Sequence, residues 1–402
     1  MAPPAADVDL VVRPVEQEVT PKVRTKGESG SRLEKSLVSS GSLEQYDHAN
    51  VTPTIGEEFP KLQLSEILRD DNKIRDLAIL VSQRGVVFFR NQDLNIDDQK
   101  ILGQKLGELT GKPETSKVWQ HLVIDHTQLH RHALSNSKRG IAVDENGKLD
   151  DEVSVISSEQ IRTFYNDRYG FKSKRIASEG WHAEYAFPHS PFVLNTDVYL
   201  SITFERIPSD YAILKIHTLP TDGSGGDTLW ASGYEAYDRL SPVWQKFAES
   251  LTATHHQPSF NRVAKQFGAE LYADARGAPE NTGLDFQASH PVVRTNPVTG
   301  WKSLFGAAHQ LEHGWIDGVT ERESDIIKAY FLQLIAENHD LQVRFKWGKN
   351  DLAIWDNRSV FHTATNDYNG KRQGNRVVSL GEKPFYDPNS ISRREALEKV
   401  EQ

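Results

Sequence analysis

Two histidines and one carboxylate in the sequence have the spacing expected of a metal site. His182 and Glu184 form an H-x-E pair, and His362 follows much later in the chain. In a β-strand, residues i and i+2 point to the same side, so His182 and Glu184 could converge on one ion. Two histidines and a carboxylate on one face hold Fe(II) and leave coordination positions open. The pair does not establish a metal site by itself, because isolated histidines commonly serve as hydrogen-bonded core or surface residues.

The segments around these residues predict a mostly β protein with helical decoration. After Gly85 the strand-like segments outnumber the helical ones, which suits a sandwich or barrel core. Helices are expected at residues 62–84, 241–251 and 323–338, the second with Ser241 as N-cap and Pro242 at its first position. Strands are expected at residues 86–90, 211–219, 352–365 and 376–385. His362 therefore lies in a late strand-like segment.

Composition restricts the chemistry and the partners. The 402 residues include no cysteine and a single methionine, Met1, which excludes disulfides, cysteine-ligated zinc, iron–sulfur clusters and thiol nucleophiles. Any metal must then be held by histidine and carboxylate. The formal net charge of -9 and the scattered basic residues argue against a nucleic-acid partner. The scarcity of sulfur has two interpretations, sulfur economy and compositional drift.

The chain divides into one large domain and two tails. Residues 1–60 are rich in Pro, Ser, Glu and Lys, which predicts a mobile or loosely docked N-terminal tail. Residues 61–390 form the predicted folded domain, and residues 391–402 a C-terminal tail. No run of 18 or more apolar residues occurs, so we expect a cytoplasmic protein with no membrane partner. Homo-oligomerisation stays open.

Five blocks of the sequence resemble the taurine dioxygenase family, in its eukaryotic branch, and follow the family's order. They are GVVFFRNQDL, GWH, GGDTLWASGYEAYDRLS, WDNRSVFHTATNDY and RQGNRVVSLGEKPFYDP, within residues 62–388. The resemblance implies a double-stranded β-helix, or jelly roll, with Fe(II) at its mouth. It also implies that His182, the carboxylate two residues later and His362 hold the iron, and that 2-oxoglutarate and O2 are cosubstrates.

The resemblance places two groups at the distal carboxylate of 2-oxoglutarate. Arginine suits such a carboxylate, because its guanidinium is planar, permanently charged and bidentate. Arg372, ten residues after His362, matches the family's arginine, and Thr228 in the GGDT block matches its hydroxyl partner. Without His362 nearby, Arg372 would be interpreted as a solvated loop charge.

The expected substrate is a small anion, and the resemblance assigns it three residues. Arg376 matches the family's second arginine, which binds the substrate sulfonate near the iron. His132 in LHRHA matches the other sulfonate contact, although Ala133 replaces the family's proline. Ser178 stands where the taurine enzyme has asparagine, and Ser135 where it has tyrosine. These departures weaken the case for taurine itself and leave other small anions open.

The activity implied by the resemblance is hydroxylation of an alkanesulfonate at the carbon that bears sulfur. Oxidative decarboxylation of 2-oxoglutarate would yield succinate and CO2, and the hydroxylated product would expel sulfite. The alternatives are the same chemistry on an aryloxyalkanoate or alkyl sulfate, and an inactive β-helix protein. A zinc hydrolase fits less well, because it accounts for neither Arg372 nor the GGDT block.

Two segments depart from the family pattern. Residues 184–201 stand where the family has a single aspartate, and their replacement by Asp would give GWHADITFERIPSDYAIL. The codons permit a retained intron there, and residues 118–128 are a shorter candidate of the same kind. The alternative is a genuine surface insertion, since long loops cost little thermodynamically. The chain as written must use Glu184 as its carboxylate, and the insertion could displace this ligand.

Overall fold

The computed structural model of the chain describes residues 36–120, 141–143, 149–158, 178, 180–183, 202–221, 223–258, 260–262, 265, 271–311, 313–365, 367–368 and 370–401. Two expected site residues, Glu184 and His132, lie outside these ranges. The candidate insertion at 184–201 lies outside them too, and the described chain resumes directly after it at Ile202.

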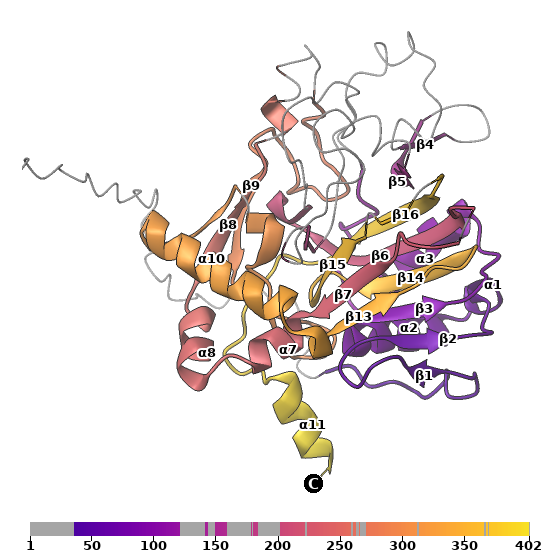
Figure 1. Cartoon of the computed structure of the whole chain (residues 1–402), viewed down its shortest axis with the longest axis horizontal. Helices are drawn as coiled ribbons and strands as arrows, with labels where there is room; N and C mark the ends of the chain where they lie inside the picture. Colours follow the sequence, from indigo (N-terminus) through magenta and orange to yellow (C-terminus); the bar gives the residue numbers. More distant parts are fainter. Residues whose placement is uncertain are drawn as a thin grey trace, which may run out of the picture.

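An eight-stranded sheet forms one layer of the core (Figure 1). Its strands in spatial order are β1 (Ala49–Asn50), β2 (Glu57–Phe59), β3 (Val86–Phe89), β14 (Asp351–Asp356), β6 (Ser209–Thr218), β16 (Gln373–Leu380), β5 (Leu149–Ser157) and β4 (Ile141–Val143). Its central pairs are antiparallel, whereas β2 runs parallel to β3. Successive residues of β3 pack into different clusters, Val87 and Phe89 on one face and Val86 and Phe88 on the other. The sheet is therefore buried on both faces.

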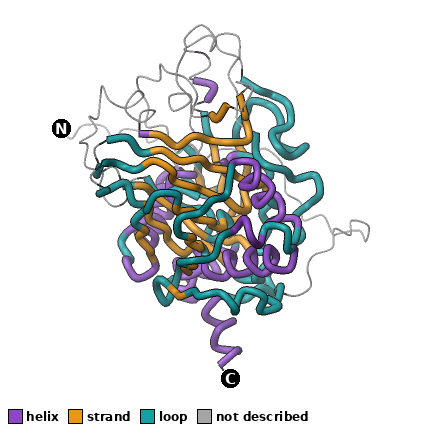
Figure 2. Tube along the Cα trace, turned by 90° about the vertical axis from the view of Figure 1, so that its right-hand side faces the viewer, coloured by secondary structure: helices purple, strands orange, loops and turns teal. Residues whose placement is uncertain are grey.

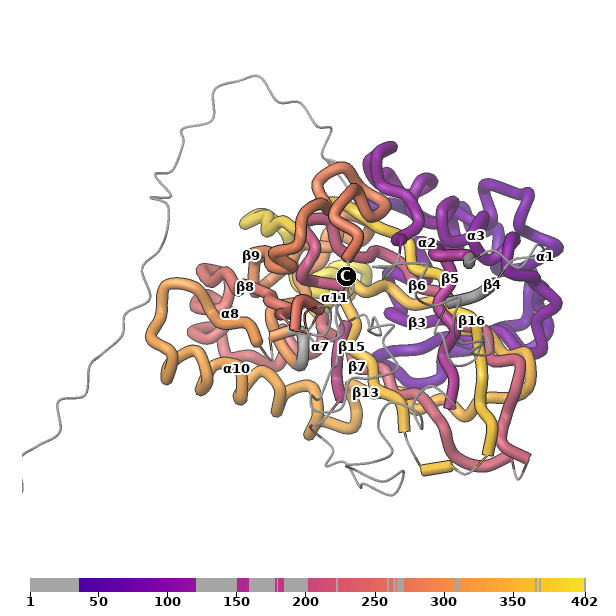
Figure 3. The backbone as a smooth tube through the Cα atoms, turned by 90° about the horizontal axis from the view of Figure 1, so that it is seen from above, coloured from indigo at the N-terminus to yellow at the C-terminus, as the bar shows by residue number. Residues whose placement is uncertain are grey.

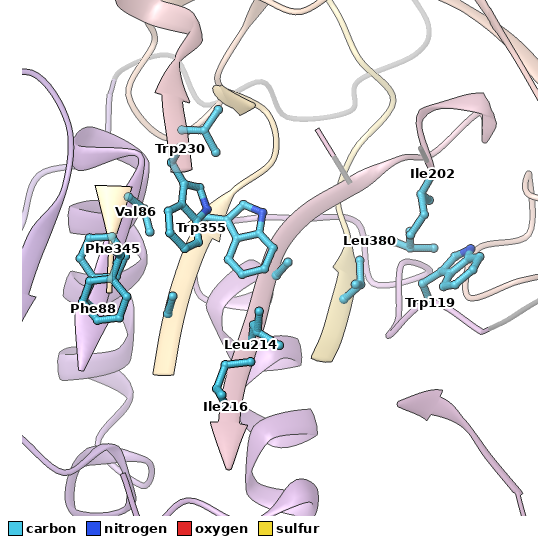
Figure 4. Packing of buried hydrophobic residues seen from close by; sticks show 14 of the residues in the cluster. Val86, Phe88, Trp119, Ile202, Leu214, Ile216, Trp230, Phe345, Trp355 and Leu380 are labelled. Carbon is cyan, nitrogen blue, oxygen red and sulfur yellow. The ribbon is translucent and has the colours of Figure 1, made fainter. Parts of the chain in front are cut away.

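A three-stranded sheet faces the large one and encloses the main hydrophobic core. It contains β13 (Gln342–Phe345), β7 (Thr228–Ser232) and β15 (Val360–Ala364), all antiparallel. Between the sheets the ring of Phe88 stacks on Phe345 with centroids 4.1 Å apart, and Trp230 meets Trp355 at 5.8 Å (Figure 4). Two facing sheets of this kind are the arrangement expected of a jelly roll.

Helices α2 (Asp71–Arg84) and α3 (Ile96–Glu108) cover the outer face of the large sheet (Figure 3). The sequence predicts one helix over residues 62–84, whereas the structure has α1 (Leu64–Ile67) followed by α2. The break occurs because the Asp70 side chain accepts a hydrogen bond from the N–H of Lys73 and so caps a new helix. Gly85 ends α2 with a φ of 77°, and β3 follows at once.

Helices α7 (Gly233–Asp238) and α10 (Glu321–Ala336) pack on the outer side of the small sheet, and α8 (Pro242–Glu249) lies beside α10. The expected cap of α8 is confirmed, since the Ser241 hydroxyl accepts from the N–H of Trp244. A capping box between Thr320 and Glu323 starts α10. Seen from above, α8 and α10 lie on the opposite side of the strands from α2 and α3 (Figure 3).

Small elements complete the fold around α10. A second three-stranded sheet has the order β12-β8-β9, and β10 pairs with β11. The bounds are β8 (Thr252–His256), β9 (Gln287–Pro291), β10 (Val293–Thr295), β11 (Lys302–Leu304) and β12 (Trp315–Ile316), with 3-10 turns η1 (Ile202–Phe204), η2 (Ala308–Leu311) and η3 (His339–Leu341). No helix in the described ranges is long and apolar enough to cross a bilayer.

Ordered structure begins earlier in the chain than the sequence predicts. The sequence suggests a loosely docked tail up to residue 60, but β1 and β2 belong to this stretch and extend the large sheet. Phe59 of β2 is fully buried and stacks on Phe89 with centroids 5.4 Å apart. The carboxylate of Asp76 also accepts hydrogen bonds from Ser40 and Ser42. The predicted boundary is therefore wrong for residues 36–60.

The other end of the chain and the shorter candidate insertion also contain structure. The predicted C-terminal tail includes α11 (Arg393–Glu401), which projects from the body (Figure 2). In the 118–128 segment, the N–H of Trp119 donates to the carbonyl of Val378 at 2.9 Å, and the indole is buried. Trp119 lies beside Leu380 and Ile202 in the core (Figure 4). This packing argues against treating the start of that segment as dispensable.

Candidate active site

His182 and His362 lie side by side on neighbouring backbone segments. The N–H of His182 donates to the carbonyl of His362 at 3.0 Å, and the N–H of His362 donates to the carbonyl of His182 at 2.7 Å. Their ring centroids are 4.3 Å apart, and each side chain is only 7% exposed. The fold thus brings together two histidines that are far apart in the sequence.

Hydrogen bonding and burial favour neutral imidazoles, which is the form that binds metal ions. The Nδ1 atom of His182 is 2.6 Å from the carbonyl oxygen of Gly180, so Nδ1 carries the proton and Nε2 keeps its lone pair. Burial holds the pKa of His362 well below its usual value, and the nearby His182 and Arg376 lower it further. The Nδ1 atom of His362 is buried and has no hydrogen-bond partner among the residues that the structure describes. These donors fit a divalent metal such as iron.

Indole rings enclose His362 on the side of the core. The ring of Trp355 has its centroid 5.0 Å from that of His362, and Trp230 stacks at 6.5 Å. Trp230 and Trp355 also contact each other between the two sheets (Figure 4). Apolar walls of this kind keep water from the imidazole and strengthen electrostatic interactions beside it.

The carboxylate partner is the unplaced member of the expected metal set. Glu184 lies outside the described residues, which end at Ala183 on this side. Within the described ranges no group of three or more His, Asp and Glu side chains has the arrangement of a metal site. The two histidines are therefore placed, while the third ligand remains a prediction from the sequence.

Arg372 places a buried positive charge near the start of β16. The side chain is 4% exposed, and its Nε and Nη2 atoms are buried without hydrogen-bond partners in the described part of the chain. Burial lowers the pKa of Arg372. An uncompensated buried cation costs on the order of several kcal/mol, a cost that a bound carboxylate would offset. The geometry therefore suits a bidentate anion.

Gly226, in the GGDT block, lets the chain pass close to this guanidinium. It has a φ of 71°, and a Cβ atom there would lie 2.7 Å from Cδ of Arg372. Any larger residue would displace the arginine or the loop. Glycine is thus required at this position for two reasons, backbone conformation and space.

Thr228 follows two residues later and is oriented by a tryptophan. The indole Nε1 of Trp347 donates to the Thr228 hydroxyl oxygen at 3.0 Å. Because the oxygen accepts this bond, the Thr228 O–H can donate to an anion. The Trp347 ring also lies 6.0 Å from the Arg372 guanidinium, so it contacts both expected anchors of the cosubstrate.

Arg376 lies within β16, four residues after Arg372, which directly precedes that strand. The Arg376 side chain is 3% exposed, and its Nη2 donates to the Ser154 hydroxyl at 3.3 Å. Its charge is close enough to His362 to lower that pKa. The structure therefore places Arg376 near the histidine pair.

The two remaining expected site residues contribute less to the described geometry. Ser178 is described and half-buried, four residues before His182. His132 lies outside the described residues. Their expected contacts with a substrate stay predictions.

Sequence reasoning missed three polar residues that support the anchors: Trp347, Ser154 and Ser158. Trp347 continues the alternation of Val343 and Phe345 along β13, so its inward orientation had a detectable signal. Ser154 lies within β5 and Ser158 directly after its end, both outside every block of family resemblance, and serine spacing alone indicates nothing.

Comparison with known proteins agrees with this geometry. The family profile described as "Taurine catabolism dioxygenase TauD, TfdA family" matches residues 47–378. The chain belongs to the TauD/TfdA family. An alpha-ketoglutarate-dependent dioxygenase of Neocamarosporium betae is 41% identical over 90% of this chain and 99% of its own length. An alpha-ketoglutarate-dependent sulfonate dioxygenase of Saccharomyces cerevisiae is 27% identical over 87% of this chain and 71% of its own.

The fold of the TauD/TfdA family is recognisable in a solved structure as well. The crystal structure of a taurine dioxygenase from Burkholderia xenovorans aligns with a TM-score of 0.55 and 22% identity, covering 86% of this chain and 92% of that one. The expected jelly roll with helical decoration is confirmed. The protein is a 2-oxoglutarate-dependent dioxygenase, and its family membership implies the use of 2-oxoglutarate and O2 on a small-molecule substrate.

Proposed function

We propose that the protein uses Fe(II) and 2-oxoglutarate to hydroxylate an alkanesulfonate at the carbon that bears sulfur, with release of sulfite. The observation that supports this proposal is the presence of two buried arginines, Arg376 on β16 near His362 and Arg372 directly before that strand. One buried cation suits the distal carboxylate of 2-oxoglutarate, and the second suits a substrate anion.

Each described site residue has a definite task in this proposal. His182 and His362 bind iron through neutral imidazoles, and Glu184 supplies the carboxylate. Arg372 and the Thr228 hydroxyl hold the distal carboxylate of 2-oxoglutarate by charge-assisted hydrogen bonds. Arg376 orients the sulfonate, with His132 and Ser178 as further substrate contacts. When bound, the iron and its cosubstrate supply the oxidising power, and the protein supplies position and a dry surrounding.

The test is product analysis on a panel of anions. We expect succinate and sulfite to form in about equal amounts with Fe(II), 2-oxoglutarate, O2 and either taurine or butanesulfonate. The panel also contains an alkyl sulfate and an aryloxyacetate, which test the alternative that the same chemistry acts on another anion. Succinate at background with every sulfonate would contradict the proposal.

Anaerobic titration with Fe(II) and 2-oxoglutarate separates an inactive form from an enzyme with another substrate. A visible charge-transfer band is expected when both ligands bind together at the site. An iron content near zero would instead favour a protein whose insertion prevents metal binding. In this titration Arg376→Ala should leave the band unchanged, because Arg376 is assigned to the substrate and not to 2-oxoglutarate.

A further inference from the structure

Strand β5 presents serine hydroxyls to both arginines of the site. Ser154 is the residue opposite Arg376 in the β16–β5 register, and its hydroxyl accepts from Nη2 of that arginine. Ser158, just past the end of β5, accepts from the backbone N–H of Arg372 at 2.9 Å and donates its own N–H to the Arg372 carbonyl. The two contacts differ in kind. Ser158 binds the main chain of Arg372, whereas Ser154 binds the guanidinium of Arg376.

We propose that Ser154 is a positioning residue that sets the orientation of the Arg376 guanidinium for the substrate anion. The inference rests on the proposed function, because it takes Arg376 as the anchor of that anion. Ser154 contacts Arg376 at Nη2, so its effect on the substrate is exerted through that arginine.

The physical reason lies in the length of the arginine side chain. A guanidinium offers five N–H donors in a rigid fork, but the stem that carries it has several rotatable bonds. Ser154 is 2% exposed, so its hydroxyl is a fixed acceptor inside the protein. The hydrogen bond from Nη2 to Ser154 favours one orientation of the Arg376 guanidinium before the anion binds. Preorganisation of this kind raises affinity by reducing the ordering that binding requires.

The same strand offers a matched control. Ser157 is as deeply buried as Ser154, at 1% exposed. It lies three positions later and therefore on the opposite face of β5, the face on which Val153 and Val155 join a small apolar cluster. Removal of its hydroxyl perturbs the same strand without touching Arg376.

The test measures anion affinity rather than turnover. Taurine and butanesulfonate are each titrated by calorimetry into the complex of the full chain with Fe(II) and 2-oxoglutarate under argon. For Ser154→Ala we expect affinity to fall about tenfold for the sulfonate, the effect of one hydrogen bond to a charged group. We expect Ser154→Thr, which keeps the hydroxyl, and Ser157→Ala to stay within about twofold of the parent chain.

Two further measurements separate positioning from a general loss of structure. The affinity of Ser154→Ala for 2-oxoglutarate and its thermal midpoint should match those of Ser157→Ala. In steady-state assays the KM for the sulfonate should rise while kcat changes little, because the anion is bound less well but the reacting groups are intact.

The outcomes distinguish this inference from the proposed function. If Arg376→Ala abolishes sulfonate binding and Ser154→Ala binds as the parent does, the positioning role is wrong and the proposed function stands. If Arg376→Ala binds both sulfonates as tightly as the parent, the anchor assignment fails and the role of Ser154 fails with it. Equal losses in Ser154→Ala and Ser157→Ala would show a merely structural effect and overturn the inference.

Discussion

At the scale of single residues, we expect Arg372 to contribute to the affinity for 2-oxoglutarate but not to the stability of the protein without ligand. Arg372→Ala removes a buried cation whose Nε and Nη2 lack partners, so the protein without ligand should be no less stable than the parent. Affinity for 2-oxoglutarate should fall about 100-fold, the scale of losing two charge-assisted hydrogen bonds. The measurements are thermal unfolding with and without 2-oxoglutarate, since a ligand that binds the native state raises the midpoint.

Arg322→Ala is the control for this comparison. Arg322 is an exposed arginine on α10, so the variant loses a side chain of the same type outside the β16 site. It should keep the full stabilisation by 2-oxoglutarate. Stabilisation of Arg372→Ala by 2-oxoglutarate to the parent's extent would contradict the assignment of this arginine.

The space beside Gly226 leads to a second prediction at this scale. In Gly226→Ala the new methyl group would meet the Arg372 side chain, so affinity for 2-oxoglutarate should fall about tenfold or more. Gly223→Ala is a matched control, because Gly223 also has a positive φ, 63°, but a Cβ there meets nothing within 4 Å. Both variants carry similar backbone strain, of about 1 kcal/mol. Equal 2-oxoglutarate affinities in the two variants would show that the contact with Arg372 is unimportant.

At the scale of elements, a buried histidine connects β9 to the described chain that begins at Ile202. Nε2 of His290 donates to the carbonyls of Thr203 and Glu205, at 2.8 and 3.1 Å. The adjacent Glu205 is itself paired with Arg276. The turn η1 is thus held by contacts from two sides.

This attachment predicts a dependence of stability on pH. Burial lowers the pKa of His290 from 6.5 to about 4, so between these values the unfolded chain takes up a proton that the folded protein does not. Stability should therefore decrease as the pH falls from about 6.5 to about 4, by up to about 3 kcal/mol from this residue, and this contribution should be constant below pH 4.

Urea unfolding across this pH range measures the effect. The His290→Gln variant keeps an N–H donor at the position of Nε2 but does not titrate, so its stability should fall less steeply with acid than that of the parent. Identical slopes for the two proteins would exclude His290 as the source. Burial also lowers the pKa of His255, and His290 lowers it further, so His255 gives both proteins an acid dependence of its own that is smaller in the variant.

The elements that the sequence predicts well are those with local signals. Ser241 and Pro242 mark the start of α8, and the continuous apolar run of β14 predicts a buried strand. The break before α2 was missed because the apolar period continues across Asp70, and only the cap reveals a second helix. β2 was missed because its three residues are too few for a period, and its burial depends on pairing with β3.

The candidate site could be predicted to a similar extent. His182, His362, Arg372 and Thr228 follow from short motifs, and the structure gives them neighbouring or buried positions consistent with that prediction. Ser154 could not be predicted, because its importance arises from the register between β5 and β16. Register is a property of the assembled sheet, which no local pattern encodes.

At the scale of the whole molecule, the 184–201 segment decides whether the chain as written can bind iron. In the shortened chain these residues are replaced by one aspartate, which restores the family pattern. We expect the shortened chain to bind about one iron per molecule with the two histidines. The full chain, with Glu184 at the start of the insertion, should bind iron less tightly.

Iron content after anaerobic loading and desalting compares the two proteins, and the transcript across residues 184–201 tests the retained-intron hypothesis directly. Equal iron content would mean that Glu184 serves as well as aspartate and that the segment is a tolerated insertion. A transcript in which the unspliced form predominates would contradict the intron hypothesis, whichever chain binds iron better.

The reciprocal backbone hydrogen bonds between His182 and His362 have a consequence for the order of folding. They join segments separated by nearly half of the chain, and such distant contacts form only after the intervening chain has been closed into a loop. The imidazole pair does not exist in any partly folded state that lacks this closure. A chain refolding from denaturant should therefore acquire affinity for metal at this pair only once the two distant segments have met.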